Sequence, residues 1–312
     1  MSRIVTLTPN PALDIAAHVA GLVPSHKMRC FAVRRDPGGG GINVARVAHR
    51  LGGNAFAIYA AGGSVGDELA VLLDREGLAH RPVRTGGQTR ESFNVFDDSS
   101  TEQYRFVLPG DSLTKEACDA CIAAALAEVS AGDIFVCSGS LPPGAPDMFY
   151  AAALRAAKSK GARTVIDSQG AALSAVLAEG VDIVKTSARE LGACLNRAPI
   201  DAREWRDALG ELLCSGRVGA AAITLGEAGA FLITPDDAWR ATVPPVHAST
   251  TVGAGDSFLG GLLVRLIAGA SLDDALRHAA AAGTAALLTS GTGLCDPAEV
   301  ARLYQDVEIA QV

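Results

Sequence analysis

The sequence lacks any apolar run long enough to cross a membrane, which needs about 18 residues. The richest candidate, Phe258 to Ala270, is short and is interrupted by Arg265. The first residues, MSRIVTLTPNPALD, are typical of a strand and a loop rather than of a secretory signal, because they contain no apolar segment followed by a small-residue cleavage site. We therefore expect a cytoplasmic protein with no membrane partner.

The chain also lacks an excess of positive charge. Its 27 basic and 34 acidic residues give a formal net charge of −7, and no basic stripe occurs along its 312 residues. Binding to nucleic acid requires many Lys and Arg side chains that neutralise phosphates. This composition argues against a nucleic-acid partner. Small anionic ligands remain compatible with it, since an acidic protein can still carry local positive sites.

The cysteines offer no disulfide framework. They are seven in number, odd and scattered, which favours reduced thiols. Cys118 and Cys121 have the C-x-x-C spacing, but they lie inside a helical pattern with no second pair and no nearby histidine. Two thiols that partly face the core explain this pair better than a redox or zinc site does.

Two common phosphate-binding motifs are missing. No G-x-x-x-x-G-K-[ST] segment occurs, and the run Gly38 to Gly41 does not fit G-x-G-x-x-G, because Asn43 occupies the third position. Four glycines before a helix still permit close approach of a ligand to the backbone. Asn43 can donate and accept hydrogen bonds at the helix start. Taken alone, however, the run is better explained as a flexible turn with an ordinary cap.

Short apolar runs alternate with helical patterns along most of the chain. Strands are expected at RIVTLT (from Arg3), AFAIYAA (Ala55), DIFVCSG (Asp133), RTVIDS (Arg163), DIVKTS (Asp182) and AAAITLG (Ala220). Helices are expected at 42–51, 66–75, 146–160, 189–196, 201–214, 256–268, 271–288 and 297–305, with Ser271 as an N-cap. This alternation predicts an α/β protein with a mostly parallel sheet covered by helices on both faces.

Two segments break the alternation, at about residues 14–35 and 88–108. In the first, HVAGLV and KMRCFAVRR look like short strands; in the second, SFNVF and QYRFV flank the polar turn DDSST and predict a β-hairpin. Together they predict a small second sheet, which would be a lid or a dimerisation surface. An edge extension of the main sheet is the alternative. No long linker or repeat occurs, so we expect one domain over residues 1–312 with this lid.

The stretch TVGAGDS places a carboxylate between a flexible loop and an apolar helix. Glycines before a helix let backbone N–H groups point at one spot, and the helix N-terminus adds positive potential. Gly253, Ala254 and Gly255 could therefore bind a phosphate or a developing anion. Asp256 beside them could accept a proton from a hydroxyl that attacks that phosphate. Aspartate is also a favoured N-cap, and from this motif alone the two roles are equally plausible.

Further polar residues recur at strand ends and in the lid segments, namely Asp14, Lys27, Arg29, Arg90, Ser138, Gly139, Ser140, Lys185 and Glu190. Each one singly is better explained as a cap or a solvated charge. In open α/β sheets, however, ligands bind beyond the carboxyl ends of the strands. Their recurrence at that one edge favours a binding site.

At this point the chain resembles the ribokinase-like, or PfkB, family of sugar kinases over essentially its whole length. PGGGGINVARVAHRLGG resembles the N-terminal motif of the family, and TVGAGDSFLGG resembles its highly specific C-terminal motif. The resemblance implies a doubly wound, mostly parallel sheet with helices on both faces and a small β-sheet lid. It also implies phosphorylation of a sugar by ATP with Mg²⁺, with K⁺ as a second ion.

Within the family, HKMRC, EQYRFVLPG and SGSLPPG are most similar to the minor ATP-dependent 6-phosphofructokinase branch. That branch converts fructose 6-phosphate to fructose 1,6-bisphosphate. The related 1-phosphofructokinases and tagatose-6-phosphate kinases carry lysine in the glycine run, as GGKGIN, where this chain has Gly40. The segment TPNPALD is nevertheless more similar in sequence to those relatives, so 1-phosphofructokinase and tagatose-6-phosphate kinase activity remain alternatives.

The resemblance also implies roles for individual residues. Asp256 would be the catalytic base and Gly253, Ala254 and Gly255 the anion hole. The hydroxyl groups of the sugar would be held by Asp14, Gly39 and Asn43. Its phosphate would be held by Lys27, Arg90 and the turn Ser138-Gly139-Ser140, with Arg29 reaching the partner's site in a homodimer formed through the lid. The nucleotide pocket would be lined by Lys185, Ser187, Thr224, Gly226, Thr251 and Gly283. The ions would be held by Glu190 for Mg²⁺ and by Thr250, Val252, Ala286, Thr289, Gly291 and Gly293 for K⁺.

One position departs from the pattern of the family. The family has N-x-x-E after this strand, and here serine at position 187 replaces the asparagine while Glu190 remains. Serine still forms hydrogen bonds to water or phosphate, with shorter reach. The departure is the one sequence feature that favours a different class of protein, a catalytically inactive sugar-phosphate sensor on a kinase fold.

Overall fold

The computed structural model describes residues 2–195 and 202–312. The expected alternation gives one large sheet whose strands run in the order β14-β13-β12-β11-β10-β9-β8-β1-β4-β5. Seven neighbouring strands of it are parallel: β5 (Ala79–Arg84), β4 (Ala55–Ala61), β1 (Ile4–Thr8), β8 (Ile134–Ser138), β9 (Arg163–Asp167), β10 (Val181–Ser187) and β11 (Val218–Thr224). The chain order reverses around β1, so the topological switch point lies between β1 and β8.

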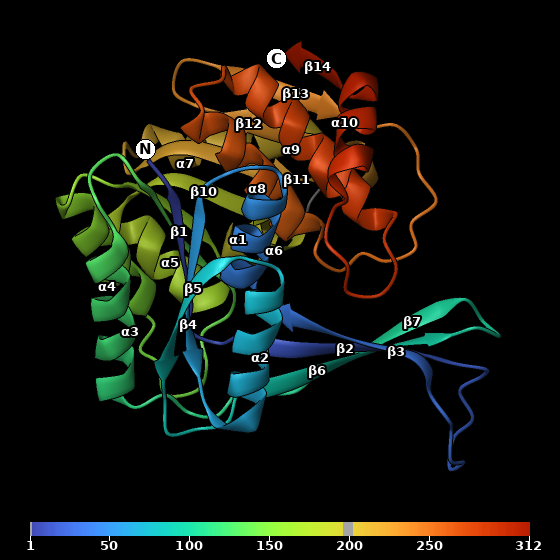
Figure 1. Ribbon diagram of the computed structural model, residues 1–312. Helices are drawn as coiled ribbons and strands as arrows, with labels where there is room; N and C mark the ends of the chain where they lie inside the picture. Colours follow the sequence, from blue (N-terminus) through green and yellow to red (C-terminus); the bar gives the residue numbers. More distant parts are fainter. Residues whose placement is uncertain (1, 196–201) are drawn as a thin grey trace.

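Helices cover both faces of this sheet, as predicted (Figure 1). One apolar core lies under α1 (Gly40–Arg50), α2 (Gly63–Arg75), α8 (Ala254–Ile267), α9 (Leu272–Leu287) and α10 (Pro297–Asp306). The other core lies under α3 (Lys115–Glu128), α4 (Phe149–Ser159), α5 (Gly170–Glu179), α6 (Ala188–Leu195) and α7 (Ala202–Cys214). Parallel strands bury both faces, which explains their almost uninterrupted apolar sequences.

Several boundaries differ from the sequence prediction. The helices predicted at 66–75 and 146–160 are α2, which begins at Gly63, and α4, which begins at Phe149. The predicted ends at Asn196 and Asp201 lie outside the described residues. Ser271 is the N-cap of α9, although its side chain makes no capping hydrogen bond there.

The sequence prediction omitted α5, a 3₁₀ turn at Gly226–Ala228 and four strands: β5, β12 (Ala230–Ile233), β13 (Ala238–Thr242) and β14 (Glu308–Gln311). β5 and β14 form the two edges of the sheet. Edge strands are partly exposed and tolerate residues such as Pro82, so their sequences carry a weak signal.

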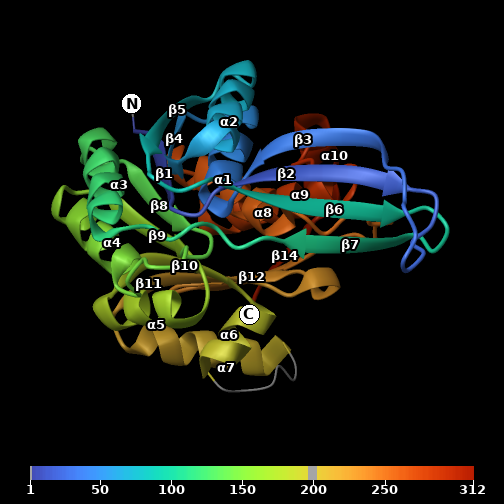
Figure 2. The same cartoon turned by 90° about the horizontal axis from the view of Figure 1, so that it is seen from below.

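A separate four-stranded sheet forms the lid, with strand order β3-β2-β6-β7. It consists of β2 (Ala12–Val19), β3 (Phe31–Gly38), β6 (Arg90–Asp97) and β7 (Glu102–Val107), and it projects from one side of the molecule (Figure 2). The second sheet is therefore confirmed, and the edge extension is wrong. The strand predicted at HVAGLV is also wrong, because β2 ends at Val19 and the N–H of Leu22 instead donates to Asp97 Oδ2 at 3.1 Å.

The two cysteines of the C-x-x-C pair are buried in the core on α3. Burial raises the pKa of the Cys121 thiol to about 12 and raises that of Cys118. Neither thiol is therefore poised as a thiolate at neutral pH. Among the residues that the structure describes, no helix has both the length and the apolar character required to cross a bilayer.

Candidate active site

The start of α8 places Asp256 inside the first helical turn rather than at its cap. The N-cap is Gly253, whose φ of 75° lies in the left-handed region that glycine adopts without strain. A Cβ at this position would lie 2.7 Å from Leu294 Cδ2, so a side chain does not fit. Asp256 follows as the third residue of α8 and is therefore not the N-cap.

Asn43 links the start of α1 to the start of α8. Its Nδ2 donates a hydrogen bond to Asp256 Oδ2 at 2.8 Å, across 213 residues of sequence. The two helices approach closely because Gly260 faces α1, where a Cβ would lie 2.5 Å from Val47 Cγ1. The glycine-run motif and the GAGD motif, which lie far apart in sequence, thus meet at one point of the sheet edge.

The environment of Asp256 shifts the pKa of its carboxyl group in two opposite directions. Burial raises the pKa of Asp256, whereas the charge of Lys185 and the hydrogen bond from Asn43 oppose this shift. A carboxylate with a raised pKa is a stronger base than a solvated one. The site therefore favours a proton acceptor that is held ionised by its neighbours.

Lys185 lies beside the expected anion hole. Its Nζ is 3.1 Å from both carboxylate oxygens of Asp167, and both side chains are buried. A Cβ at Gly255 would lie 2.8 Å from this Nζ. Burial raises the pKa of Asp167 to about 6, although Lys185 opposes the shift. The family resemblance assigns Lys185 to the nucleotide pocket. Its ammonium group thus lies where its positive charge would stabilise a transferring phosphoryl group.

Asp14 lies inside β2 and not after the first strand, as the sequence suggested. A Cβ at Gly38 would lie 2.2 Å from Asp14 Oδ2, so glycine leaves the room that this carboxylate occupies. Burial raises the pKa of Asp14 to about 6, which Arg90 and Arg105 oppose and Asp256 reinforces. The two carboxylates are therefore close enough to interact electrostatically.

The glycine run holds the turn after β8 against the start of α1. Gly39 has a φ of 109°, and a Cβ at Gly40 would lie 2.3 Å from Ser138 Oγ and 2.9 Å from the Gly139 nitrogen. Lysine at position 40, as in GGKGIN, does not fit this arrangement. Ser138 Oγ is buried and has no hydrogen-bond partner in the described part of the chain, whereas Ser140 is exposed. Ser138 therefore has the free hydroxyl on the inner side of the turn.

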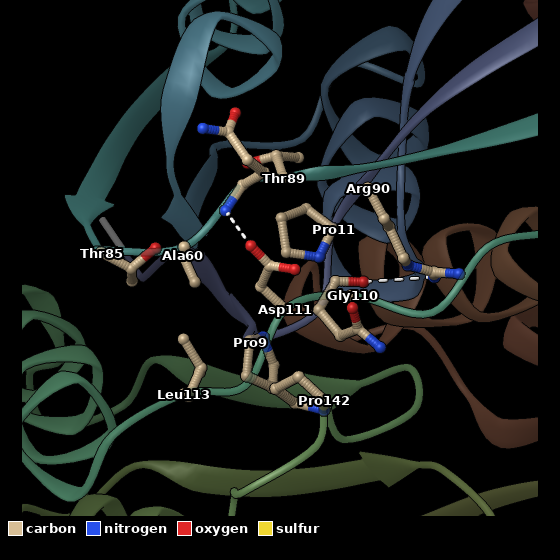
Figure 3. Close-up of a pocket in the computed structure, with 13 residues that line it drawn as sticks. Pro9, Pro11, Ala60, Thr85, Thr89, Arg90, Gly110, Asp111, Leu113 and Pro142 are labelled. Carbon is tan, nitrogen blue, oxygen red and sulfur yellow. Dashed lines mark hydrogen bonds between the residues drawn. The ribbon is translucent and has the colours of Figure 1, made fainter.

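Arg90 lies at the wall of a small cavity of about 20 Å³, which is lined mainly by the loops that connect the main sheet to the lid strands (Figure 3). Its two Nη atoms each donate to a backbone oxygen at 3.3 Å, of Leu108 and of Asn10. Its Nε is buried and has no partner among the described residues. Burial lowers the pKa of Arg90, and the charge of Asp14 opposes this shift. Arg90 is thus a cation whose Nε donor is not used by the protein.

The expected nucleotide residues lie farther along the same sheet edge. Ser187 and Thr224 are paired in register at the ends of β10 and β11, and Gly226 opens the following 3₁₀ turn with φ 61°. Ser187 donates from N and Oγ to Glu190 Oε2, at 2.9 and 2.8 Å. Serine therefore still fixes the carboxylate of Glu190.

Two further residues from the nucleotide set lie near the start of α8. A Cβ at Gly283 would lie 3.3 Å from the Ala254 oxygen, so α9 packs closely on that helix start. Thr251 is exposed in the loop before it.

The loops expected to hold K⁺ lie next to each other. The N–H of Ser249 donates to the Leu287 oxygen at 2.7 Å, and the N–H of Val252 donates to Thr250 Oγ1. Thr289 Oγ1 lies 2.8 Å from the Ala286 oxygen and 2.9 Å from the Gly293 oxygen. The Thr289 hydroxyl has one proton and can donate to only one of these two carbonyl oxygens at a time. The two carbonyls therefore converge at a point where acceptors outnumber donors.

The neighbouring Gly291 approaches the lid. A Cβ there would lie 3.0 Å from Ala16 Cβ on β2. This loop, which the sequence places far from the lid, therefore packs directly against it.

Lys27 and Arg29 do not join this cluster. Both are exposed in the segment between β2 and β3, at the far end of the lid (Figure 2). The cluster instead includes two residues that sequence reasoning missed. Burial raises the pKa of both Asp14 and Asp256, and the charge of Arg105 on β7 opposes this rise. Asp167 pairs with Lys185. In the sequence of β7, EQYRFV, Arg105 lies between Tyr104 and Phe106, and this alternation predicts that Arg105 points to the opposite face of the strand from the two aromatic residues.

Within the described residues, no group of three or more His, Cys, Asp or Glu side chains is arranged to hold a metal. Magnesium in phosphoryl-transfer sites is held by one or two carboxylates together with the phosphates of the substrate. Glu190 is compatible with this mode, because the two hydrogen bonds that Ser187 donates to it are both accepted by the same carboxylate oxygen, Oε2.

A partly buried carboxylate at a glycine-framed helix start, next to a buried lysine at the carboxyl edge of a parallel sheet, is the arrangement expected of a phosphoryl-transfer site. The model of the pfkB family carbohydrate kinases matches residues 8–299. The chain belongs to this family, and the expectation from its two motifs is confirmed.

Individual relatives agree with this assignment. The chain is 40% identical over 305 residues to ATP-dependent 6-phosphofructokinase isozyme 2 of Escherichia coli (strain K12), covering 97% of this chain and 98% of that protein. It is 34% identical to 1-phosphofructokinase of Rhodobacter capsulatus, over 98% and 97% of the two chains. The crystal structure of phosphofructokinase-2 from Escherichia coli in complex with potassium superposes with a TM-score of 0.94 at 39% identity, over 98% and 99% of the two chains. The ribokinase-like fold with its small second sheet is therefore confirmed.

Proposed function

We propose that this chain transfers the γ-phosphoryl group of ATP to the C1 hydroxyl of fructose 6-phosphate, giving fructose 1,6-bisphosphate and ADP. The 2.8 Å contact between Asn43 and Asp256 carries this proposal, because it joins the sugar end of the site to the base. The greater identity to a 6-phosphofructokinase than to a 1-phosphofructokinase supports the choice of sugar. The lack of space for a side chain at Gly40 supports it as well.

The mechanism uses the residues around the start of α8. Asp256 accepts the proton of the attacking hydroxyl, whose oxygen forms a bond to the γ-phosphorus as the bond to the ADP oxygen breaks. The backbone N–H groups of residues 253–255 and the ammonium of Lys185 stabilise the charge on the transferring group. The lid covers the sugar and excludes water, which would otherwise compete as the acceptor.

Two ions accompany this chemistry. Glu190 is the carboxylate that would hold Mg²⁺ bound to ATP, and the ion would supply positive charge to the phosphate oxygens. K⁺ would be held by carbonyls of the loops at 250–252 and 286–293, of which those of Ala286 and Gly293 converge on Thr289 Oγ1. Its role would be to fix the loop that precedes α8.

A coupled ADP-release assay tests the proposed activity. The substrates are fructose 6-phosphate, fructose 1-phosphate, tagatose 6-phosphate and unphosphorylated sugars, each with and without K⁺. The highest kcat/KM is expected with fructose 6-phosphate. A preference for another ketose phosphate would assign the chain to the 1-phosphofructokinase or tagatose-6-phosphate kinase alternative. ADP formation with none of them would favour the catalytically inactive sensor.

Removing Arg90 is expected to raise KM for the sugar phosphate. Arg90→Ala deletes a half-buried cation whose buried Nε donor is unused in the described part of the chain, and hydrogen bonds to a charged group contribute about 1.5–3 kcal/mol. KM should therefore rise about 10- to 100-fold in steady-state kinetics with varied sugar phosphate. Arg84→Ala, which removes an exposed arginine paired with Asp67, is the matched control. An unchanged KM in Arg90→Ala would assign this arginine to lid structure alone.

A homodimer formed through the lid completes the proposal. One face of the lid sheet carries the cross-strand pairs Phe93–Phe106 and Val95–Tyr104, and Val33 lies on β3, the opposite edge strand of the sheet. Phe106 is 51% exposed and Val33 is 59% exposed. An apolar patch of this kind on a projecting sheet marks an interface. A dimer would also bring the lid segment with Lys27 and Arg29 to the partner's sugar phosphate.

The dimer is expected to dissociate when this apolar face is charged. The double variant Val33→Lys/Phe106→Lys should run as a monomer in sedimentation velocity at micromolar concentration, since two buried charges would oppose association. Val71→Lys, at an apolar position on α2 that is 47% exposed, should keep the wild-type mass. A monomeric wild-type protein, or a double variant that remains dimeric, would contradict the proposed interface.

A further inference from the structure

We propose that Arg46 is the positioning residue that fixes the side-chain amide of Asn43, and through it the hydrogen bond that Asn43 donates to Asp256. The inference rests on the proposed function, in which Asp256 is the base. Arg46 itself does not touch Asp256 in the contacts of the described residues. It acts one step away, from the next turn of the same helix.

Arg46 is held rigidly from several sides. It is 1% exposed and is one of the largest fully buried side chains among the described residues. Its Nε donates to both carboxylate oxygens of Glu76, at 2.9 and 3.0 Å, and its Nη2 donates to the same carboxylate. Its Nη1 donates to the Pro37 oxygen at 2.6 Å and reaches Asn43 Oδ1 at 3.3 Å. Nη2 also lies 3.8 Å from Asp36 Oδ1.

The chemistry of the guanidinium sets the orientation of the amide. A guanidinium only donates hydrogen bonds, so the Asn43 atom that faces Arg46 is the carbonyl oxygen. The NH₂ group of Asn43 then points to Asp256, which as an ionised carboxylate only accepts. If the amide turned over, its oxygen would face the carboxylate and its NH₂ group would face the guanidinium. Both contacts would be repulsive, and Arg46 therefore selects the orientation that supports the base.

Asp256 is influenced by several charged groups in addition to the hydrogen bond from Asn43. Lys185 on β10, Arg105 on β7, Glu190 on α6 and Asp14 on β2 all interact with its charge, and Asp167 on β9 pairs with Lys185. Glu76 on α2 and Asp36 on β3 surround the guanidinium of Arg46. The charged groups that act on Asp256 itself are unchanged in the variants below, so a change in the titration of Asp256 reports the loss of the Asn43 hydrogen bond.

A double-mutant cycle in kcat separates positioning from general stability. Arg46→Lys keeps the charge but cannot bind Glu76, the Pro37 oxygen and Asn43 together. We expect kcat to fall about 10-fold or more, with KM for ATP changed less than about 3-fold, and the acidic limb of the kcat–pH profile to move to higher pH. In an Asn43→Ala background, Arg46→Lys should lower kcat by less than about 3-fold. Additive losses would overturn the proposal.

The control and a fallback variant come from the same ion cluster. Arg50→Lys also alters a partner of Glu76, at 3.3 Å, but Arg50 has no contact with Asn43 in the described contacts. Its kcat and pH profile should equal those of the wild type. If Arg46→Lys does not fold, as judged by thermal unfolding, Glu76→Gln replaces it in the cycle. That variant weakens the anchor of the guanidinium and should show the same coupling to Asn43→Ala.

A readout that does not depend on activity completes the test. The sequence contains five asparagines, so ¹⁵N-asparagine labelling gives five side-chain amide signals, and Asn43→Ala identifies the relevant one. This signal should shift or broaden in Arg46→Lys and remain unchanged in Arg50→Lys. An unchanged signal in Arg46→Lys would overturn the positioning role. If the wild type formed no ADP with any sugar, the proposed function would fail while this measurement still decided the role of Arg46.

Discussion

Replacing Asp256 with asparagine is expected to lower kcat by about 10²–10⁴-fold, the usual contribution of a general base. Asparagine has nearly the same shape, but its amide cannot take the proton of the sugar hydroxyl. KM for ATP should change little, because Asp256 faces Asn43 and the sugar end of the site. Steady-state kinetics with a coupled ADP assay at pH 7.5 measures both quantities.

The same variant is expected to be at least as stable as the wild type. The fold raises the pKa of Asp256, mainly by burial, so ionising this carboxyl at neutral pH costs free energy in the folded state. Asparagine removes that cost, and thermal unfolding should show a Tm that does not fall. Asp119→Asn, which changes an exposed carboxylate on α3, is the control and should leave kcat and Tm unchanged. Near-normal turnover in Asp256→Asn would remove the base from the mechanism.

The role proposed for Asp256 illustrates what the sequence could predict. Position 256 was recognised from local chemistry, since glycines before an apolar helix indicate an anion site. The sequence could not show that Asp256 is not the cap, because the N-cap lies three residues earlier, at Gly253, and the hydrogen-bond partner of Asp256, Asn43, lies 213 positions away. Local patterns specify which groups are available, whereas long-range packing decides what each group contacts.

The fold shows the same division between local and long-range information. The parallel strands and their covering helices were predicted because buried strands are continuously apolar. The lid sheet was predicted from its hairpin, but Asp14 was assigned to a loop and lies within β2, whose partners β3 and β6 come from separate segments. Arg46 was not singled out from the sequence, since its partner Glu76 lies 30 residues away on another helix. Such roles depend on tertiary contacts and leave no local signal.

Replacing Lys185 with methionine is expected to reduce both stability and activity. The variant leaves the buried carboxylate of Asp167 without its partner, and removing one member of a buried pair typically costs about 3–5 kcal/mol of unfolding free energy. It also removes a positive charge beside the anion hole, for which a kcat loss of about 10²–10³-fold is typical. Urea unfolding and steady-state kinetics measure the two effects separately.

The loss of stability in Lys185→Met should depend on pH with a defined sign. With Lys185 present, burial already raises the pKa of Asp167 to about 6, compared with its ordinary value of 3.8. Without the lysine this folded-state pKa rises further. A carboxyl with a raised folded-state pKa stabilises the fold most when protonated, and that stability is lost as the pH rises through the folded-state pKa. The difference in unfolding free energy from the wild type should therefore be larger at pH 8 than at pH 5.5.

A second substitution distinguishes the structural role of Lys185 from its catalytic role. Lys185→Met/Asp167→Asn removes both charges of the buried pair, so most of the lost stability should return. The kcat should stay low, because the positive charge beside Gly255 is still absent. Lys158→Met, which breaks an exposed pair with Asp182, should cost at most about 1 kcal/mol and leave kcat unchanged. If kcat recovered together with stability in the double variant, Lys185 would stabilise the fold without acting on the phosphoryl group.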